Sequence, residues 1–287
     1  MNATIKELTQ GSADWLEYRR TKRNASESAA VMGLSPWCTP YRLWLIKTGR
    51  YEEKINAAMQ RGTELEPAAR AAYEAHTGLV MQPLVLEDGA YSASLDGMTL
   101  QGDLIVEIKC PMRGSRSDLW QDLTQGIIPQ HYLVQIQHQL MVSNATQAHF
   151  WAYDGVQGQL AYVPRDEALI QRIREAWDAF EPYLINDTPP PLTEADTVLR
   201  SDEAWTQAAL AYTEAKKLAE DHAEKLEAAR KNLLALAQHP RETGSGVSVT
   251  RFWKAGAVAY KDIPELKVVD LDKYRSKARE EVRISVG

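Results

Sequence analysis

Two acidic side chains and a lysine lie close together in the segment 94–110, and residues of these types could cut a phosphodiester bond with the help of a metal ion. Asp96 precedes a glycine, and Glu107 and Lys109 are separated by one residue. A two-residue turn at Gln101-Gly102, where the glycine can take a positive φ, predicts a hairpin in which Asp96 pairs with Glu107. Directly opposed carboxylates repel each other, and a divalent cation between them would make both of them ligands.

The chemistry expected of this cluster is metal-assisted hydrolysis. Carboxylate oxygens are hard donors that favour Mg²⁺, with Mn²⁺ as a possible substitute. The metal would polarise the phosphate and help to ionise the attacking water, while Lys109 would orient that water. Strand alternation places Glu107 and Lys109 on one face and Val106 and Ile108 on the other, apolar face. On an exposed strand, however, the same residues would form only a solvated face with a weak ion pair.

The surrounding pattern predicts an α/β fold, a mixed β-sheet flanked by helices. Ser12 and Ser26 are expected to cap the first two helices, Gly78 to close the fourth, and Pro67 to bend or interrupt it. Helices are expected at 14–21, 26–33, 40–49, 55–76, 117–123, 130–142 and 167–184, and strands at 79–86, 90–96, 104–110, 147–153 and 159–163.

Three prolines at 189–191 predict a domain boundary, with a first domain at 1–188, a linker at 189–194 and a second region at 195–287. The second region begins with a heptad seam in a long predicted helix, from Trp205 to Leu236. A glycine-containing turn at 244–246 is expected to end it, and residues 247–253 read as a strand. The seam is expected to pack either on a helix of the same chain, such as 167–184, or on another molecule, and the proline break favours the first.

The distribution of charge along the chain does not exclude a nucleic-acid partner. The net charge is −6, but residues 1–50 hold eight Lys or Arg against four Asp or Glu, so a local basic patch can exist in an acidic chain. The two cysteines, Cys38 and Cys110, are expected to be reduced thiols. The N-terminus does not read as a secretory signal and no apolar run is long enough to span a membrane, so a cytoplasmic location is expected.

Four stretches stand out, in order along about residues 12–155. They read Trp-Leu-Glu-Tyr-Arg at 15–19 with Ala-Ser-Glu at 25–27, Arg-Gly-Thr-Glu-Leu-Glu-Pro-Ala-Ala-Arg at 61–70, Ser-Leu-Asp-Gly at 94–97 with Glu-Ile-Lys-Cys-Pro at 107–111, and Tyr-Leu-Val-Gln-Ile-Gln-His-Gln-Leu at 132–140. Together they resemble the phage-type exonucleases of the lambda exonuclease and YqaJ recombinase group, within the PD-(D/E)XK nuclease superfamily.

The resemblance implies a role for each matching position. Arg19 and Ser26 would bind the 5′-phosphate of a DNA end, as an arginine fork near a short helix can do. The other implied roles are metal binding by Asp96, Glu107, Glu66 and the Ile108 carbonyl, catalysis by Lys109, and a place in the active site for Gln135. Glu64 competes with Glu66, Gln137 lies close to Gln135, and Leu95 stands where many relatives have proline.

The function implied by the resemblance is Mg²⁺-dependent exonuclease activity on double-stranded DNA ends, from 5′ to 3′. The 3′ single-stranded tails would serve a single-strand annealing protein in a phage- or prophage-type system of a bacterial host. Because relatives can form a ring-shaped trimer, a homotrimer is one expectation. Two alternatives stay open: a nuclease of the same superfamily with other polarity or endonucleolytic action, and a non-catalytic scaffold that binds DNA ends.

Overall fold

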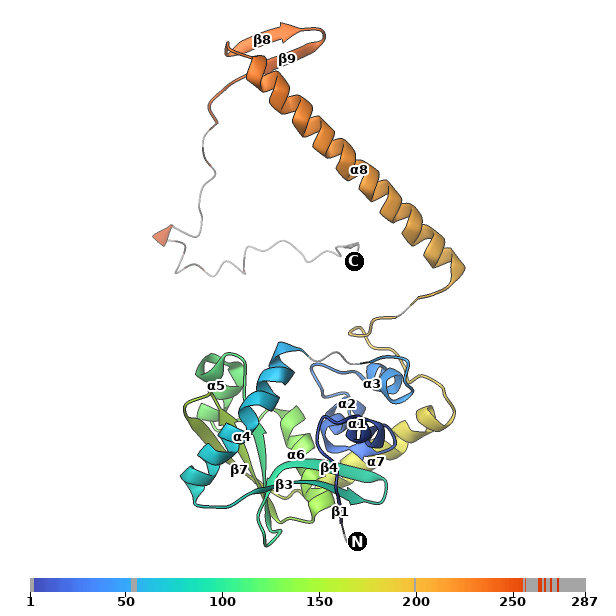
Figure 1. Cartoon of the computed structure of the whole chain (residues 1–287), viewed down its shortest axis with the longest axis vertical. Coiled ribbons are helices and arrows are strands. Elements are labelled where there is room, and N and C mark those ends of the chain that lie inside the picture. The colour runs from blue at the N-terminus through green and yellow to red at the C-terminus, as the bar shows by residue number, and fades with distance from the viewer. Residues whose placement is uncertain are drawn as a thin grey trace. The chain divides into compact units, whose positions relative to one another are not determined.

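A computed structural model describes residues 3–52, 56–198 and 200–254, together with positions 256, 263, 264, 266, 269 and 273. Ile55, the predicted start of the fourth helix, lies outside the described residues. The chain divides into two compact units, residues 1–197 and 198–287 (Figure 1). In the part of the chain that the structure describes, no helix is both long enough and apolar enough to cross a membrane.

Unit 1 is built on one mixed sheet of seven strands among the described residues, in the order β1-β3-β4-β5-β6-β7, with β2 paired to β4. β5 and β6 run parallel, as do β2 and β4, and the other neighbours are antiparallel. The strands are β1 (Thr4–Lys6), β2 (Arg23–Asn24), β3 (Gln82–Asp88), β4 (Tyr91–Met98), β5 (Leu104–Lys109), β6 (Gln147–Tyr153) and β7 (Gly158–Pro164).

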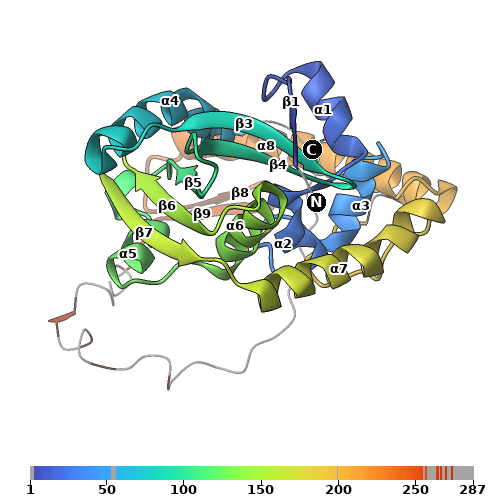
Figure 2. The ribbon, with the colours of Figure 1, turned by 90° about the horizontal axis from the view of Figure 1, so that it is seen from below.

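Helices cover both faces of this sheet (Figure 2). On one face, α4 packs Ala69 and Tyr73 against Val106 and Ile108 of β5. On the other, α6 packs against the sheet together with part of α7, and α2 and α3 form a second cluster with α7. The helices are α1 (Ala13–Arg20), α2 (Ser28–Val31), α3 (Pro40–Lys47), α4 (Ala57–Thr77), α5 (Asp118–Thr124), α6 (Gln130–Ser143) and α7 (Glu167–Ile185), with short 3₁₀ turns η1 (Ala25–Glu27) and η2 (Gly114–Arg116). The predicted fold class, a mixed sheet flanked by helices with a C-terminal helix, is confirmed.

Local signals explain where the helices begin and end. The Ser12 side chain accepts from the Trp15 amide at the start of α1, and Gly78, with φ of 73°, closes α4. Pro67 lies inside a continuous α4, so the helix is not interrupted there, and a bend at Pro67 stays a prediction. The prediction for Ser26 was wrong: it caps no helix, since it lies within η1 and accepts a hydrogen bond from Arg19.

The hairpin of β4 and β5 has the predicted register, because Gly97 pairs with Val106 and Met98 with Ile105. The turn is longer than predicted. The Gly102 amide, at φ of 75°, donates to the Thr99 carbonyl, so the turn spans 99–102 instead of two residues. Asp96 is not a ladder partner of Glu107, which corrects the prediction that the two residues pair directly.

Unit 2 consists of a long helix and a hairpin among its described residues. α8 (Glu203–Leu236) has Asp202 as its N-cap, and β8 (Arg241–Gly244) pairs with β9 (Val247–Thr250). The helix ends at Leu236, before the turn at 244–246 that was predicted to end it. That turn instead connects β8 to β9, with Ser245 and Gly246 at positive φ. The predicted strand at 247–253 is shorter, and β8 was not predicted.

Candidate active site

Glu107 is the buried centre of the site. Only 1% of the residue is exposed, although it carries a carboxylate. Gln135 donates to one oxygen of this carboxylate at 2.6 Å, and Gln139 donates to the other at 2.5 Å. The two glutamines are four residues apart on α6 and therefore share one face of that helix. Glu107 faces α6 because strand alternation turns Val106 and Ile108 toward α4.

The Lys109 ammonium is the third donor to Glu107 and binds the same oxygen as Gln135. It also lies over the Tyr132 ring, 5.5 Å from the centroid. Burial alone would lower the pKa of Lys109, but the carboxylates of Glu107 and Asp96 outweigh burial and raise it. Lys109 is therefore a cation held among acids, and it can donate protons in hydrogen bonds without giving them up.

Asp96 reaches the site from an irregular part of β4. Gln82 pairs with Met98 and Leu84 with Leu95, so β4 carries one extra residue relative to β3, a β-bulge that redirects side chains. The Asp96 carboxylate accepts from the Ile108 amide at 2.7 Å and so takes the place of a ladder bond. Burial, and then the charge of Glu107, raises the pKa of Asp96 well above its usual range.

Glu66 joins these acids from α4, while Glu64 does not. Arg70, one turn along the helix, lies 3.6 Å from Glu66 and donates to the Asp96 carbonyl at 2.7 Å, so it connects the two acidic residues. Burial raises the pKa of Glu66; Arg70 opposes this and Glu107 adds to it. Glu64 is exposed and accepts from Gln60 at 2.8 Å. Of the two competing residues, Glu66 is therefore the one beside the cluster.

The donor types at this cluster fit a hard divalent cation, because they are carboxylate oxygens with a main-chain carbonyl available at Ile108. Burial is the main cause that raises the pKa values of Asp96 and Glu66, and the charge of Glu107 adds to it; a bound cation would oppose both effects. Within the described ranges, no three Asp, Glu, His or Cys side chains are grouped tightly enough to hold a metal ion by themselves. Both Glu107 oxygens already accept from Lys109 and the two glutamines, so a bound cation would need further oxygens from main chain, water or substrate.

Arg19 and Ser26, the pair expected at a DNA 5′-phosphate, lie in contact. The Arg19 guanidinium donates to the Ser26 hydroxyl at 2.8 Å, lies 3.5 Å from Glu27, and stacks over the Trp15 ring at 4.5 Å. The buried Lys47 ammonium donates to Glu27 and to main-chain carbonyls at the end of α1. This arrangement holds an arginine fork beside a serine hydroxyl, which suits an anion.

A chain of contacts joins the arginine–serine pair to the acidic cluster. The Trp15 indole donates to the Ser94 hydroxyl at 3.1 Å, and the Ser94 carbonyl accepts from Gln139 at 3.3 Å. Gln139 in turn holds Glu107. The two groups of predicted site residues therefore belong to one connected part of unit 1.

Sequence reasoning passed over three residues that hold the cluster together: Gln139, Arg70 and Ser94. Gln137, which was considered beside Gln135, lies elsewhere: it bonds the Pro164 carbonyl and the Asp166 amide. Spacing offered a signal for two of the residues passed over. Gln139 is one helical turn from Gln135, and Arg70 is one turn from Glu66, so each shares a helix face with a predicted site residue.

The chain is similar to known proteins over much of unit 1. Residues 14–146 match the YqaJ-like viral recombinase domain. The chain is 31% identical over 136 residues to the uncharacterized protein YqaJ of Bacillus subtilis; this covers 45% of the chain and 41% of that protein, so the chain spans about two fifths of the length of this curated relative.

Among solved structures, the chain is similar to an alkaline exonuclease from Laribacter hongkongensis. The sequences are 30% identical, the TM-score is 0.53, and the match covers 62% of this chain and 94% of that exonuclease. The same enzyme in complex with dAMP matches with 29% identity and a TM-score of 0.52, again over 62% of this chain and 94% of the other.

Proposed function

The chain belongs to the YqaJ-like viral recombinase family, and we propose that it is a DNA exonuclease that uses Mg²⁺ to hydrolyse double-stranded ends from 5′ to 3′. The observation that carries the proposal is the convergence of Asp96, Glu66 and Lys109 around the buried Glu107 in one partly buried cluster. Burying carboxylates next to one another raises their pKa values and gains the fold no stability, so such a cluster favours a chemical role.

The residues present would divide the work as follows. Asp96, Glu107, Glu66 and the Ile108 carbonyl would hold the cation, and Mg²⁺, when bound, supplies charge that polarises the phosphate and acidifies a water. Lys109 would hydrogen-bond the attacking water and offset negative charge as it develops on the phosphate.

Two further groups of residues would position the reactants. Gln135 and Gln139 hold the Glu107 carboxylate in one orientation. Arg19 and Ser26 would bind a terminal 5′-phosphate, which supports the proposed polarity because the enzyme would start at that end. A DNA substrate is further supported by the similar exonuclease of Laribacter hongkongensis, whose structure holds dAMP. The annealing-protein partner, the homotrimer and the cytoplasmic location stay predictions.

Digestion of linear duplex DNA labelled at one 5′ or one 3′ end tests the proposal, with closed circular DNA as the control. In Mg²⁺ the 5′ label should be released first while circles stay intact, and EDTA should stop the reaction. Glu66→Gln should slow cleavage by about tenfold or more, as loss of a metal-site residue does. Glu64→Gln, on the same helix but facing Gln60, is the matched control and should keep the wild-type rate.

Other outcomes select other functions. Earlier release of the 3′ label would refute the polarity, and cutting of closed circles would indicate an endonuclease. If the protein binds ends in Mg²⁺ or Mn²⁺ and never cuts them, the scaffold alternative holds.

A further inference from the structure

The long helix α8 presents an apolar seam that the described chain leaves uncovered. The helix has 34 residues, which corresponds to about 51 Å, and none of them is buried. Trp205 is 51% exposed and Leu226 72% exposed. The seam follows a heptad spacing and consists of Trp205, Ala208, Tyr212, Ala215, Ala219, His222, Leu226, Ala229, Leu233 and Leu236.

The proline break at 189–191 favours a partner helix for this seam within the same chain, and α7 is one candidate. That helix is already used. Ile173, Trp177 and Phe180 of α7 are buried in a cluster with α2 and α3 within unit 1. The apolar face of α7 is therefore not available for a second helix.

The order of large and small side chains along the seam fits a second copy of α8 in antiparallel orientation. If two copies pair about the midpoint between residues 220 and 221, seam residues whose numbers sum to 441 lie opposite one another. Seam positions then meet in the alternation that antiparallel helix pairs require. The layers are Trp205 with Leu236, Ala208 with Leu233, Tyr212 with Ala229, Ala215 with Leu226, and Ala219 with His222.

In this register the small side chains face larger ones. The three alanines at 208, 215 and 229 each oppose a Leu or Tyr, so these three layers have similar volumes, and the largest layer, Trp205 with Leu236, lies at the end of the helix. A parallel, in-register pair would instead place Tyr212 against Tyr212 and Ala215 against Ala215, which alternates overfilled and empty layers. Moving the antiparallel register by one heptad leaves either Trp205 or Leu236 without an opposite residue.

Charges beside the seam agree with the antiparallel pair. The flanking positions carry Lys216, Lys225 and Arg230 and no acidic residue. In a parallel pair Lys225 of one copy would approach Arg230 of the other, and like charges at these positions repel. In the antiparallel pair the flanking contacts join a basic residue to an apolar one: Lys216 to Ala223, Arg230 to Ala209, and Lys225 to Leu218.

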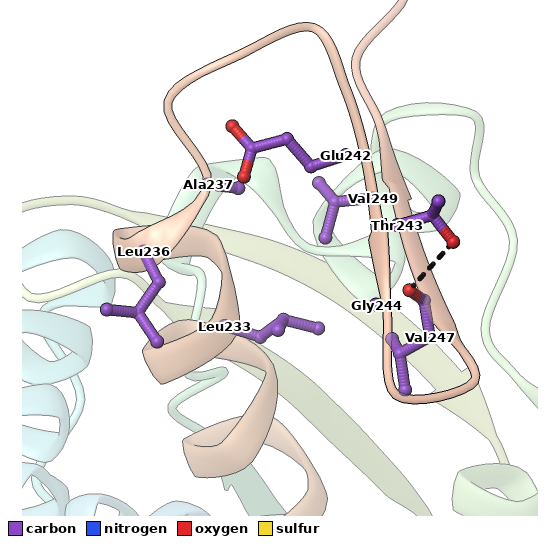
Figure 3. Close-up of a pocket in the computed structure, with 8 residues that line it drawn as sticks. All are labelled: Leu233, Leu236, Ala237, Glu242, Thr243, Gly244, Val247 and Val249. Carbon is purple, nitrogen blue, oxygen red and sulfur yellow. Dashed lines mark hydrogen bonds between the residues drawn. The ribbon is translucent and has the colours of Figure 1, made fainter.

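A groove at the C-terminal end of α8 offers a place for the tryptophan of the second copy. The groove has a volume of about 220 Å³ and lies between the end of the helix and the hairpin of β8 and β9 (Figure 3). It is lined by Leu233, Leu236, Ala237, Glu242, Thr243, Gly244, Val247 and Val249. Arg251 fastens the hairpin to the helix by donating to the carbonyls of Leu234 and Ala237, at 3.1 Å each. In the antiparallel register the partner's Trp205 lies opposite Leu236, at this groove.

We propose that α8 pairs antiparallel with α8 of a second copy and that each Trp205 enters the groove of the other copy. The interface is self-complementary, as a two-fold axis requires. It is independent of any association of unit 1, so a nuclease unit that itself forms rings would be joined pairwise through these helices.

The mass of the full chain in solution, measured by light scattering after size exclusion, tests the pairing. Ala215→Glu places a charge against Leu226 of the second copy and should halve the mass of the wild-type assembly. Ala228→Glu makes the same substitution on the outer face of α8 and should leave the mass unchanged. Circular dichroism of both variants should show equal helix content, which separates loss of pairing from loss of the helix.

Disulfide cross-linking tests the orientation. In the double variant Ala215→Cys with Leu226→Cys the two positions are about 16 Å apart along one helix, too far for an internal bond. Oxidation should therefore give a covalent dimer joined from 215 to 226. The wild type, with Cys38 and Cys110, is the background control, and Ala215→Cys alone should not cross-link through 215.

The proposal is overturned by an unchanged mass in Ala215→Glu, or by a 215-to-215 bond in the single-cysteine variant, which would make the pair parallel. Absence of the 215-to-226 bond in a wild-type-sized assembly would equally exclude the register. None of these outcomes depends on nuclease activity, so failure here and failure of the proposed function are distinguishable.

Discussion

Acid should destabilise unit 1 through one buried histidine, His138. The residue is 0% exposed and lies on α6 between the site glutamines. Its Nδ1 is 2.6 Å from the Ser28 hydroxyl, which accepts from the Trp177 indole at 2.9 Å. A hydroxyl that accepts from the indole keeps its own hydrogen for a second partner, so Ser28 can donate to an unprotonated Nδ1. Burial, and then the charge of Arg174, lowers the pKa of His138 from 6.5 to about 3.

The sign and size of the effect follow from proton linkage. The folded protein keeps His138 neutral down to pH near 3, whereas the unfolded chain takes up a proton near pH 6.5. Stability from this residue is therefore fully present above pH 6.5 and is lost as pH falls toward 3. One proton corresponds to roughly 1.4 kcal/mol per pH unit, so between pH 7.5 and 4.5 the contribution of His138 to the free energy of unfolding should fall by about 3 kcal/mol.

Urea unfolding at several pH values measures this loss. His138→Phe removes the titrating group and costs about 1 to 3 kcal/mol at neutral pH, because the Ser28 hydroxyl loses its acceptor. The wild type should lose its advantage over the variant as pH falls, by about 1.4 kcal/mol per unit between pH 6 and 4. His239→Gln, at an exposed histidine, is the control and should keep the wild-type slope. A difference between wild type and His138→Phe that is independent of pH would refute the reasoning.

Three predictions concern the site. Lys109→Ala should slow single-turnover cleavage by about 10²-fold with little change in DNA affinity, because the ammonium acts in the chemical step; loss of binding at an unchanged single-turnover rate would show that its role is binding. Arg19→Ala should reduce the preference for a 5′-phosphate over a 5′-hydroxyl end, measured as the ratio of kcat/KM values; a wild type without any preference contradicts this role. Gln139→Ala frees one Glu107 oxygen and should lower kcat by about 10-fold to 100-fold, whereas Gln137→Ala, a change at a buried glutamine of the same helix, should lower stability and leave kcat intact. Equal kcat values in these two glutamine variants would count against a positioning role for Gln139.

The fold could be predicted wherever the signal was local. Ser12 and Gly78 mark helix ends through a side-chain hydrogen bond and a backbone angle, and each functions as expected. Strands β1 and β2 were not predicted because they have only three and two residues and are stabilised by pairing with strands far along the chain. β1 pairs with β3 across about 80 residues, and no local pattern specifies that contact.

The position of Asp96 shows where reasoning from a hairpin stops. The turn and alternation correctly set the register of Gly97 with Val106. The bulge beside them depends on the pairing of β4 with β3, on its other edge, which a two-strand argument does not contain. Gly97 is also required there for a tertiary reason, since a Cβ would lie 2.7 Å from Met81. The sequence predicted which residue reaches the cluster but not the route that its carboxylate takes.

Lys47 shows why the supporting residues of the site were harder to predict than its acids. From sequence it is a basic residue in the last turn of α3, where a lysine ordinarily faces solvent and balances the helix dipole. Its side chain is instead 2% exposed, and its ammonium donates to Glu27 at 2.6 Å and to the carbonyls of Arg19 and Lys22 at 2.8 and 2.6 Å. A buried ammonium is tolerated only when all its hydrogens are bonded, and here those bonds fix the end of α1. The contact between Arg19 and Ser26 therefore depends on a lysine 28 residues away from Arg19, and that dependence became visible only when the chain was folded.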